Sequence, residues 1–281
     1  LLIVLYSNWY LHEHEDLGRY YGWLIAFMGS MMGVVFSDHL ITLFIFWELT
    51  SVTSFFLIGF WSDREAAIYG SQKALLITGG GGLAMLAGFL LLGQATGEWQ
   101  LSKLIAMPGV SEKVTLAAFI LIIMGAATKS AQWPFHIWLP NAMEAPTPIS
   151  AFLHSATMVK AGIYLLSRFY PILGGHPAWG YVVISLGMTT MITGGLLSLR
   201  AHDLKAILAY GTISQLGLIV TFLGYGGEEA IIGSTLHLYN HAAAKAAMFM
   251  IVGIIDHETG TRDVRLLGHL SRKMPRSHIL A

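Results

Sequence analysis

Cysteine is absent from the 281 residues of this chain, and charged residues make up only 11% of them. The lack of cysteine excludes disulfides, thiolate zinc sites and iron–sulfur clusters held by this chain. An average soluble domain has roughly 25% charged residues, so the low charge points to a different environment. Lysine plus arginine and aspartate plus glutamate both number 16. This balance argues against a broad surface for nucleic acid, and no motif for nucleic-acid binding occurs.

Long apolar runs are what the sequence has instead. Apolar residues make up 55% of the chain, and roughly 20 of them in succession cross about 30 Å of hydrocarbon as a helix. The runs that we predict to span a membrane are residues 20–36, 40–61, 66–92, 114–131, 149–170, 179–199, 207–224 and 230–255. Since no water-exposed domain or low-complexity linker separates them, the expected fold class is all-α, a single polytopic bundle of transmembrane helices.

The start of the chain and its basic loops indicate how the bundle is placed. Residues 1–6 read Leu-Leu-Ile-Val-Leu-Tyr without an initiator methionine, so we expect a fragment of a longer chain that begins at the end of a helix. Basic residues in short loops favour the cytoplasmic side of a membrane. This rule predicts that Arg200, the basic segment 262–276 and the loop 63–65 face the cytoplasm, whereas the loop 98–113 lies outside.

A weak internal repeat pairs the second predicted span with the seventh. Residues 40–51 align with residues 204–215, and the two segments lie five helices apart. An odd offset means that the two copies enter the membrane from opposite sides, as in the inverted repeats of many transporters. Few identities support the alignment, so a chance likeness between two apolar helices stays open as the alternative.

Glu48 is the clearest candidate for chemistry inside the membrane. It lies eight residues into its predicted span, about 12 Å along a helix that rises 1.5 Å per residue. A charge at that depth is costly even on the mildest scales. A carboxylate there must therefore hold a proton or face a cation. The alternative is a structural ion pair that locks two helices together.

Lys129 stands near the end of the fourth predicted span, shortly before Pro134. Proline cannot donate a hydrogen bond to the carbonyl of Ser130, four residues back, and its ring opens that helical turn. A broken helix within a membrane persists only where protein or water satisfies the freed backbone groups. We therefore predict a break in the helix, with water beside Lys129. The alternative is a lysine that extends along the bilayer to reach the interface.

Histidine and lysine side chains form a polar stripe on two later helices. His154 and Lys160 share one predicted span, and His237, His241 and Lys245 recur every four residues on another. A spacing of four keeps side chains on one face of a helix. Histidine titrates near neutral pH, so the stripe is suited to passing protons between lysines.

Other interpretations of these residues stay open. Two histidines four apart resemble a metal clamp, but Leu238 stands where a zinc protease needs glutamate, and Lys245 would repel a cation. Packing of the histidines against Tyr239 and Asn240 is a second alternative. A haem is disfavoured because one helix cannot supply both axial ligands at this spacing. We predict no metal and no cofactor. Lys205 is either a member of the polar path or a lysine that reaches the interface.

Several segments together resemble a known family, the proton-translocating antiporter-like subunits shared by multisubunit Na+/H+ antiporters, respiratory complex I and membrane-bound hydrogenases. The matching segments are 46–51 (Phe-Trp-Glu-Leu-Thr-Ser), 129–134 (Lys-Ser-Ala-Gln-Trp-Pro), 145–162, 208–215 and the trio His237, His241 and Lys245. The resemblance covers nearly the whole chain. Within the family, residues 159–164 and 256–263 look like the large A-type subunit of Mrp-type Na+/H+ antiporters.

The resemblance implies a fold of two inverted five-helix repeats, each with a broken helix that carries a lysine. Residues 1–178 would hold the end of a preceding helix and the first repeat, and residues 179–281 about three helices of the second. The second broken helix would then lie beyond Ala281.

The resemblance also implies roles for the ionisable residues. Glu48 and Lys129 would form the charge pair of a first half-channel. The members of a central polar axis would be His154, Lys160, Lys205, His237, His241 and Lys245. Such a chain is a secondary transporter subunit of the cell membrane and not an enzyme. Its partners would be other antiporter subunits, the lipid bilayer, protons and a monovalent cation such as Na+, without nucleic acid. The alternative is a redox-driven proton-pump subunit of complex I or of a membrane-bound hydrogenase.

Overall fold

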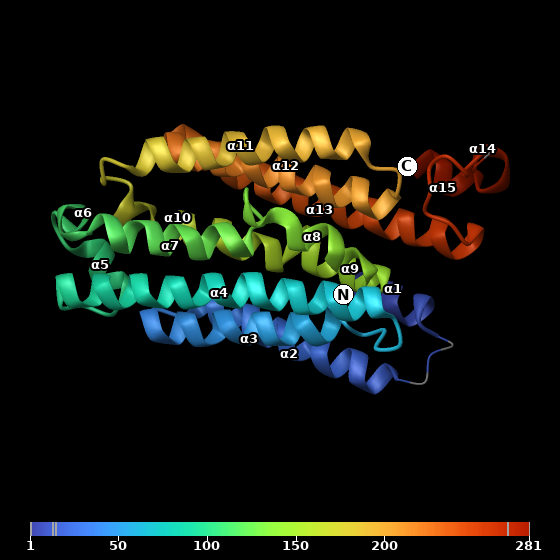
Figure 1. Ribbon diagram of the computed structural model, residues 1–281, viewed down its shortest axis with the longest axis horizontal. Helices are drawn as coiled ribbons and strands as arrows, with labels where there is room; N and C mark the ends of the chain where they lie inside the picture. Colours follow the sequence, from blue (N-terminus) through green and yellow to red (C-terminus); the bar gives the residue numbers. More distant parts are fainter. Residues whose placement is uncertain (1, 13, 15, 269, 281) are drawn as a thin grey trace.

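The computed structural model describes residues 2–12, 14, 16–268 and 270–280. Within these residues the chain is almost entirely helical, and strand-like pairing is limited to two isolated bridges. The long helices run along the long axis of the molecule, so that they form an elongated bundle (Figure 1). The all-α fold class expected from the sequence is confirmed.

The first part of the chain contributes long helices and then a broken one. Its helices are α1 (Leu2–Tyr10), α2 (Leu17–Phe36), α3 (Leu40–Ile58), α4 (Glu65–Thr96), α5 (Leu101–Ala106), α6 (Val110–Lys113) and α7 (Leu116–Lys129). Short helical turns follow, namely η1 (Phe135–Ile137), α8 (Trp138–Asn141) and η2 (Ala142–Glu144). The α4 helix packs along α7, and α2 packs along α3.

The later part begins with a second interrupted helix. Its elements are α9 (Thr147–Ala151), the π-helical turn η3 (Phe152–Ala156), η4 (Met158–Lys160), α10 (Ala161–Leu173), α11 (Trp179–Arg200), α12 (Leu204–Tyr225), α13 (Glu228–Thr259), α14 (Leu270–Lys273) and α15 (Pro275–Leu280). The α12 helix packs against α11 and α13, and α10 contacts both α7 and α12. The interrupted segment therefore lies where the early and late helices meet.

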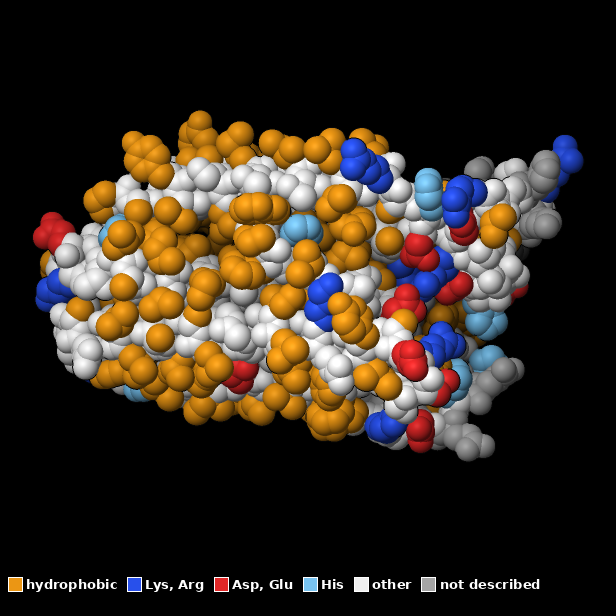
Figure 2. Space-filling view, in the orientation of Figure 1, with side chains coloured by type: hydrophobic (Ala, Val, Ile, Leu, Met, Phe, Trp, Pro, Cys, Tyr) orange, Lys and Arg blue, Asp and Glu red, His pale blue; other side chains and the backbone are white. Residues whose placement is uncertain are grey.

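Six segments of the described chain are long and apolar enough to cross a membrane. They are α3, α4, the α9–α10 segment, α11, α12 and α13. The two other predicted spans correspond to α2, whose first turn contains Arg19, and to the short apolar helix α7. On the face shown in Figure 2, apolar side chains cover the length of the bundle, and charged side chains gather at one end. This distribution suits a helix bundle surrounded by lipid.

The connections between the long helices lie at the two ends of the bundle. The turns after α3, α11 and α13 lie at the end where charged side chains gather, which we call the charged end, and α5 and α6 lie at the other (Figures 1 and 2). This is the grouping that the basic loops predicted. The assignment of the charged end to the cytoplasm stays a prediction.

The predicted break beside Lys129 is confirmed. The α7 helix ends at Lys129, and Ala131 adopts a φ of 48°, in the left-handed region. The carbonyl of Ser130, to which Pro134 cannot donate, accepts a hydrogen bond from the Gln132 side-chain amide at 2.9 Å. A protein group thus satisfies the freed carbonyl. The expected water beside the lysine stays a prediction.

A second interruption corrects the sequence analysis, which predicted one continuous helix over residues 149–170. The α9 helix passes into the π-helical turn η3, and Thr157 leaves the helical region at φ −125° and ψ −86°. The Thr157 hydroxyl donates to the Phe152 carbonyl at 2.8 Å, and the Ser155 hydroxyl donates to that of Ala151. These side chains offer the backbone an alternative to regular helix bonds. Single π-helical turns within helices often mark functional sites.

A backbone clasp closes the open end of the α3–α4 pair. The Leu40 amide donates to the Trp99 carbonyl at 3.0 Å, and the Leu101 amide donates to the Asp38 carbonyl at 2.7 Å. The α4 helix is 32 residues long and is capped by Gly97, whose φ of 73° lies in the region that favours glycine. We call this pair of hydrogen bonds the first clasp.

A second clasp of the same form closes the α12–α13 pair. The Leu204 amide donates to the Arg262 carbonyl and the Val264 amide to the His202 carbonyl, both at 2.9 Å. The α13 helix is also 32 residues long and is capped by the left-handed glycine Gly260. The two clasps lie at opposite ends of the bundle (Figure 1). These matched features support the inverted repeat, whose division at residue 178 we keep as a proposal.

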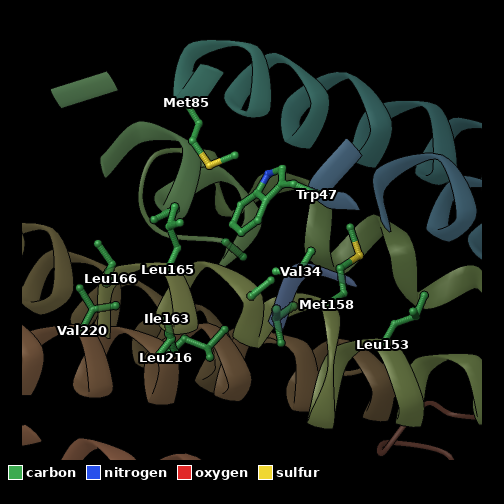
Figure 3. Packing of buried hydrophobic residues seen from close by; sticks show 14 of the residues in the cluster. Val34, Trp47, Met85, Leu153, Met158, Ile163, Leu165, Leu166, Leu216 and Val220 are labelled. Carbon is green, nitrogen blue, oxygen red and sulfur yellow. The ribbon is translucent and has the colours of Figure 1, made fainter. Parts of the chain in front are cut away.

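Buried apolar side chains join the early helices to the late ones. Trp47 of α3, Ile163 and Leu165 of α10, and Leu216 of α12 belong to one cluster of buried residues. Figure 3 shows Ile163 next to Leu216, where α10 meets α12. This core holds the interrupted segment before α10 in place between the two groups of helices.

Candidate functional site

The ionisable side chains predicted for the site all lie within the bundle. The buried ones are Lys129, His154, Lys160, Lys205 and His241. The half-buried ones are Glu48, His237 and Lys245. They come from α3, α7, the interrupted segment before α10, α12 and α13. Ionisable groups in membrane-spanning segments are costly and rare, which marks this set as a functional candidate.

Lys129 ends α7 and directs its ammonium group toward α3. The Nζ atom donates to Ser51 Oγ at 2.7 Å and to the Trp47 carbonyl at 3.3 Å, and it lies 5.5 Å from the centre of the Trp47 ring. Ser51 lies three residues after Glu48 and therefore on nearly the same face of α3. The sequence analysis missed Ser51 as a partner of the lysine, although this spacing was a usable signal.

Glu48 approaches the same region without touching Lys129. Among the described residues the two side chains form no ion pair, although their charges interact electrostatically across the helices. The Glu48 carboxylate packs against Gly82 of α4, and its Oε1 atom is buried without a hydrogen-bond partner among the described residues. The structure thus brings the expected charge pair together but places Ser51 in direct contact with the lysine.

The glycine run on α4 makes room for this cluster. A Cβ atom at Gly82 would collide with the Glu48 carboxylate, and one at Gly81 would collide with the Thr128 side chain of α7. A Cβ atom at Gly80 would meet nothing within 4 Å. Small residues at these positions therefore let α3 and α7 approach α4 closely.

Lys160 and His241 connect the interrupted segment to α13. Lys160 Nζ and His241 Nδ1 are in hydrogen-bonding contact, and His241 Nε2 has no partner among the described residues. Only 6% of Lys160 and 5% of His241 is exposed, so this contact is shielded from bulk water. An imidazole with one nitrogen on a lysine and the other free can take up a proton on one side and release it on the other.

His237 and Lys245 link the same helix to α12. His237 Nε2 is 2.7 Å from Gln215 Oε1, and its ring centre lies 6.5 Å from that of His241. Because an amide oxygen only accepts, His237 Nε2 carries a hydrogen in this contact. Lys245 Nζ donates to the Leu208 carbonyl at 3.4 Å. Gln215 is a further polar member that the sequence analysis did not assign to the site.

His154 and Lys205 extend the polar chain toward the charged end. His154 is fully buried beside Trp138, with ring centres 6.0 Å apart, and neither ring nitrogen has a partner among the described residues. Lys205 Nζ donates to the Ala145 carbonyl at 2.9 Å and to the Met143 carbonyl at 3.4 Å. The charge of Lys205 acts on the His154 ring. The two residues therefore continue the path to the start of α12.

Two more polar groups border the break after α7. Gln132 Oε1 and His136 Nδ1 are buried without a partner among the described residues. Nearby, Lys73 of α4 donates to Asn141 Oδ1 of α8 at 2.8 Å, which ties α4 to the segment after the break. Periodicity could not reveal Gln132 and His136, because both lie where the helix is irregular.

His237 and His241 have the spacing of a metal clamp, but the structure places no further ligand group beside them among the described residues. In the part of the chain that the structure describes, no group of three or more His, Cys, Asp or Glu side chains could hold a metal ion. The Lys160 ammonium contacts His241, and such a charge opposes a cation at that place. The expectation that the chain binds no metal and no cofactor stays a prediction.

Two carboxylates beside the clasps are held ionised. Ser102 donates to Asp38 through its hydroxyl at 2.6 Å and its backbone amide at 2.9 Å, and these hydrogen bonds lower the pKa of Asp38. Arg265 Nη2 lies 2.6 Å from Asp263 Oδ2, and the hydrogen bonds from this arginine lower the pKa of Asp263 to about 2. Each clasp is therefore accompanied by a carboxylate that stays charged at neutral pH.

Residues 37–280 match the family described as "NADH:quinone oxidoreductase/Mrp antiporter, TM". The chain belongs to this family. The A-type subunit of the Na(+)/H(+) antiporter of Alkalihalophilus pseudofirmus is 51% identical to it over 291 residues, which cover 98% of this chain and 36% of that relative. The corresponding A-type antiporter protein of Bacillus subtilis is 50% identical over 288 residues with the same coverage. The chain thus spans about a third of the length of these members of the antiporter family.

Two solved structures share the fold of this family member. The Mrp complex from Dietzia sp. DQ12-45-1b superposes with a TM-score of 0.88 and 43% identity over 93% of this chain and 29% of the other chain. The membrane-bound sulfane sulfur reductase, an archaeal respiratory membrane complex, gives a TM-score of 0.85 and 26% identity over 92% of this chain and 54% of the other. The resemblance drawn from the motifs is confirmed, and the chain is a multi-pass membrane protein of the antiporter-like type.

Proposed function

We propose that this chain moves protons through the membrane as part of a multisubunit monovalent cation/proton antiporter, with Na+ as the expected cation. The observation that carries the proposal is the polar chain buried among apolar helices, in which Lys160 contacts His241 and Lys129 contacts Ser51. Lysine and histidine inside a membrane are typical of proton relays. Relatives named as Na(+)/H(+) antiporter subunits support this choice within the family.

Each predicted site residue has a proposed part in the path. Glu48 and Lys129 exchange protons at the contact of α3 with α7, where Ser51 holds the lysine. The remaining members of the proposed path are His154, Lys160, Lys205, His237, His241 and Lys245. Both ring nitrogens of His154 lack a partner among the described residues, so one of them can accept a proton without first losing a hydrogen bond. The free Nε2 of His241 can do the same when Lys160 is neutral and accepts the Nδ1 hydrogen.

The active unit is proposed to be a complex in the plasma membrane. The first relatives are subunits, and the chain corresponds to 36% of their length, so further helices and subunits are the proposed partners together with the lipid bilayer. In this proposal the chain is part of a secondary transporter, and it neither binds a cofactor nor catalyses a covalent reaction.

A redox-driven proton pump is the second candidate. The family description includes NADH:quinone oxidoreductase, and the archaeal respiratory complex shares the fold. In such a pump the same polar chain would respond to electron transfer elsewhere in the complex. The higher identity to the antiporter subunits, 51% against 26% for the respiratory complex, favours the antiporter.

Vesicles that contain the assembled complex separate the two candidates. For the antiporter we expect a Na+ gradient to drive proton movement without any electron donor, and Lys129→Met to lower that flux by at least about tenfold, as loss of a proton-transfer group predicts. Proton movement that requires an electron donor and ignores gradients of Na+ and K+ would replace the antiporter with the redox pump.

A further inference from the structure

Arg262 joins several elements at the charged end of the bundle. Its backbone carbonyl accepts the Leu204 amide in the second clasp. Its Nε atom lies 2.9 Å from Asp203 Oδ2, and its Nη2 atom lies 3.6 Å from Glu144 Oε1. One side chain therefore connects the start of α12 with the end of η2, the segment that follows the broken helix.

The segment that Arg262 holds is also the segment that receives Lys205. The carbonyls of Met143 and Ala145 accept hydrogen bonds from Lys205 Nζ at 3.4 Å and 2.9 Å. Glu144 lies between these two residues, and its side chain reaches Arg262. The same short stretch of chain thus binds the buried lysine through its backbone and the outer arginine through its side chain.

Arg262 and its two carboxylate partners are much more exposed to solvent than Lys205 is. The side chains of Arg262, Glu144 and Asp203 are 24%, 35% and 36% exposed, whereas Lys205 is only 2% exposed. Asp203 is fixed in addition, because its Oδ1 atom accepts the Ala206 amide at 2.9 Å as the N-cap of α12. The three charged side chains form a layer that water reaches, and Lys205 lies beneath it.

The first clasp offers an internal comparison. In the first clasp the Trp99 carbonyl accepts the amide of Leu40, the first residue of α3. In the second clasp the Arg262 carbonyl accepts the amide of Leu204, the first residue of α12, so Trp99 and Arg262 occupy equivalent positions. The Trp99 indole ring packs at Gly93 of α4 and brings no charge to that end. The first clasp thus forms without an arginine at the position of Trp99, and the arginine beside it, Arg168, approaches the Asp38 carboxylate from α10. Formation of the clasp itself therefore does not require the Arg262 side chain.

We infer that Arg262 is a positioning residue that seals the Lys205 end of the polar chain from bulk water by holding η2 against the start of α12. The planar guanidinium group suits this task because it can engage two carboxylates at once, which a lysine ammonium does less well. Partly exposed ion pairs contribute little to global stability, so loss of this contact opens the entrance locally without unfolding the bundle. The seal concerns only the access of bulk water to Lys205. Any effect of the seal on proton movement rests on the proposed function.

Single-cysteine reporters test the seal in the assembled complex, because these 281 residues contain no cysteine that would react beside them. Ala145→Cys reports on the segment that receives Lys205, and Ala118→Cys reports on a buried position near the start of α7. Reaction with a charged methanethiosulfonate reagent is followed by mass spectrometry of this chain. We expect Arg262→Gln to raise the reaction rate at Ala145→Cys about tenfold, as loss of a local latch predicts, and to leave the rate at Ala118→Cys unchanged.

Matched variants separate the seal from a general loosening. Arg262→Lys keeps the charge but not the two-pronged contact, so an intermediate rate is expected. Arg265→Gln removes a neighbouring arginine that pairs with Asp263 instead, and it is expected to leave the rate unchanged. Met143→Cys, also at a buried position, is the second reporter if Ala145→Cys does not assemble.

Two results would overturn the seal, namely an unchanged rate in Arg262→Gln and an equal rise at Ala118→Cys. Proton flux is measured in the same variants as a separate test of the proposed antiporter function. If labelling rises as expected while even the parent complex shows no cation-coupled flux, the seal stands and the antiporter proposal fails.

Discussion

Lys129 and Glu48 show how charged groups are accommodated in a membrane without a direct ion pair. The lysine donates to a hydroxyl and a carbonyl, and the carboxylate keeps one oxygen without a partner among the described residues. Two unit charges about 4 Å apart interact by roughly 4 kcal/mol at an effective dielectric of about 20, which would strongly favour the doubly charged state. With Ser51 as the direct partner, the lysine can change its protonation state without leaving a carboxylate unpaired at hydrogen-bonding distance.

Replacing Glu48 tests whether this carboxylate carries protons. We expect Glu48→Ala to abolish cation-coupled proton flux in the assembled complex and Glu48→Asp to retain part of it, because aspartate keeps the titratable group at a shorter reach. Flux in vesicles is measured beside the amount of assembled complex. Parent-level flux from Glu48→Ala at normal assembly would remove the residue from the path.

His241 tests the contact between the interrupted segment and α13. We expect His241→Gln to lower flux by about 100-fold, the lower end of what a general acid–base group typically contributes, with little effect on assembly. His257→Gln on the same helix is the control, because His257 is exposed and pairs with Glu258 near the charged end. If flux in His241→Gln only tracks the amount of assembled complex, the histidine serves packing.

At the scale of helices, the glycine run of α4 controls how near α3 and α7 can come. We expect Gly81→Ala to destabilise the chain by about 1–3 kcal/mol, the typical cost of overpacking, since its Cβ would collide with the short, buried side chain of Thr128. Gly80→Ala is the matched control, because nothing lies within 4 Å of its Cβ position. Unfolding in detergent and proton flux are the measurements. Equal behaviour of the two variants would show that α4 shifts freely against α7.

The two helix interruptions differ in how far the sequence predicted them. Pro134 removes a backbone donor, and this local rule placed the break beside Lys129. The interruption around Thr157 was missed, because it depends on hydroxyl groups that bond to nearby carbonyls and no proline marks it. Serine and threonine do this in only some contexts, so their presence in a span carries little information alone.

In the candidate site, too, the sequence predicted single residues but not the partners that other helices bring to them. Positions such as Glu48 and His241 were predictable, because an ionisable residue in an apolar run is conspicuous at any register. Their partners were not, since Ser51 on Lys129 and Gln215 on His237 depend on which helix faces which. The role of Arg262 was hidden for a related reason, because Glu144 and Asp203 are far from it in the chain.

At the scale of the whole molecule, each end carries a clasp with a carboxylate beside it. The pKa of Asp263 falls from the ordinary 3.8 to about 2, so folding favours its ionised form. A lowered pKa contributes stability that is complete above the unfolded value and is lost as the pH falls through the folded value. We expect the stability advantage of the parent over Asp263→Asn to shrink between about pH 4 and pH 2. Thermal unfolding in detergent measures it.

Asp38 allows the same measurement of stability against pH at the opposite end of the bundle, because hydrogen bonds from Ser102 lower its pKa. The advantage over Asp38→Asn is expected to shrink in the same direction, as the pH falls below the ordinary value of 3.8. An advantage that stays constant or grows on acidification would mean that these carboxylates are not stabilised as anions in the folded chain.

The clasps also bear on how such a chain is made. The first clasp joins Leu40 to Trp99, so everything it needs has been synthesised before α12 begins. Cooperative units in hydrogen exchange often coincide with supersecondary motifs such as a helix pair. The amides at the start of α3 and just after α4 are therefore expected to become protected together during biogenesis, ahead of those that join α12 to the chain after α13. A ribosome can thus leave one finished helix pair in the bilayer while the other is still being translated.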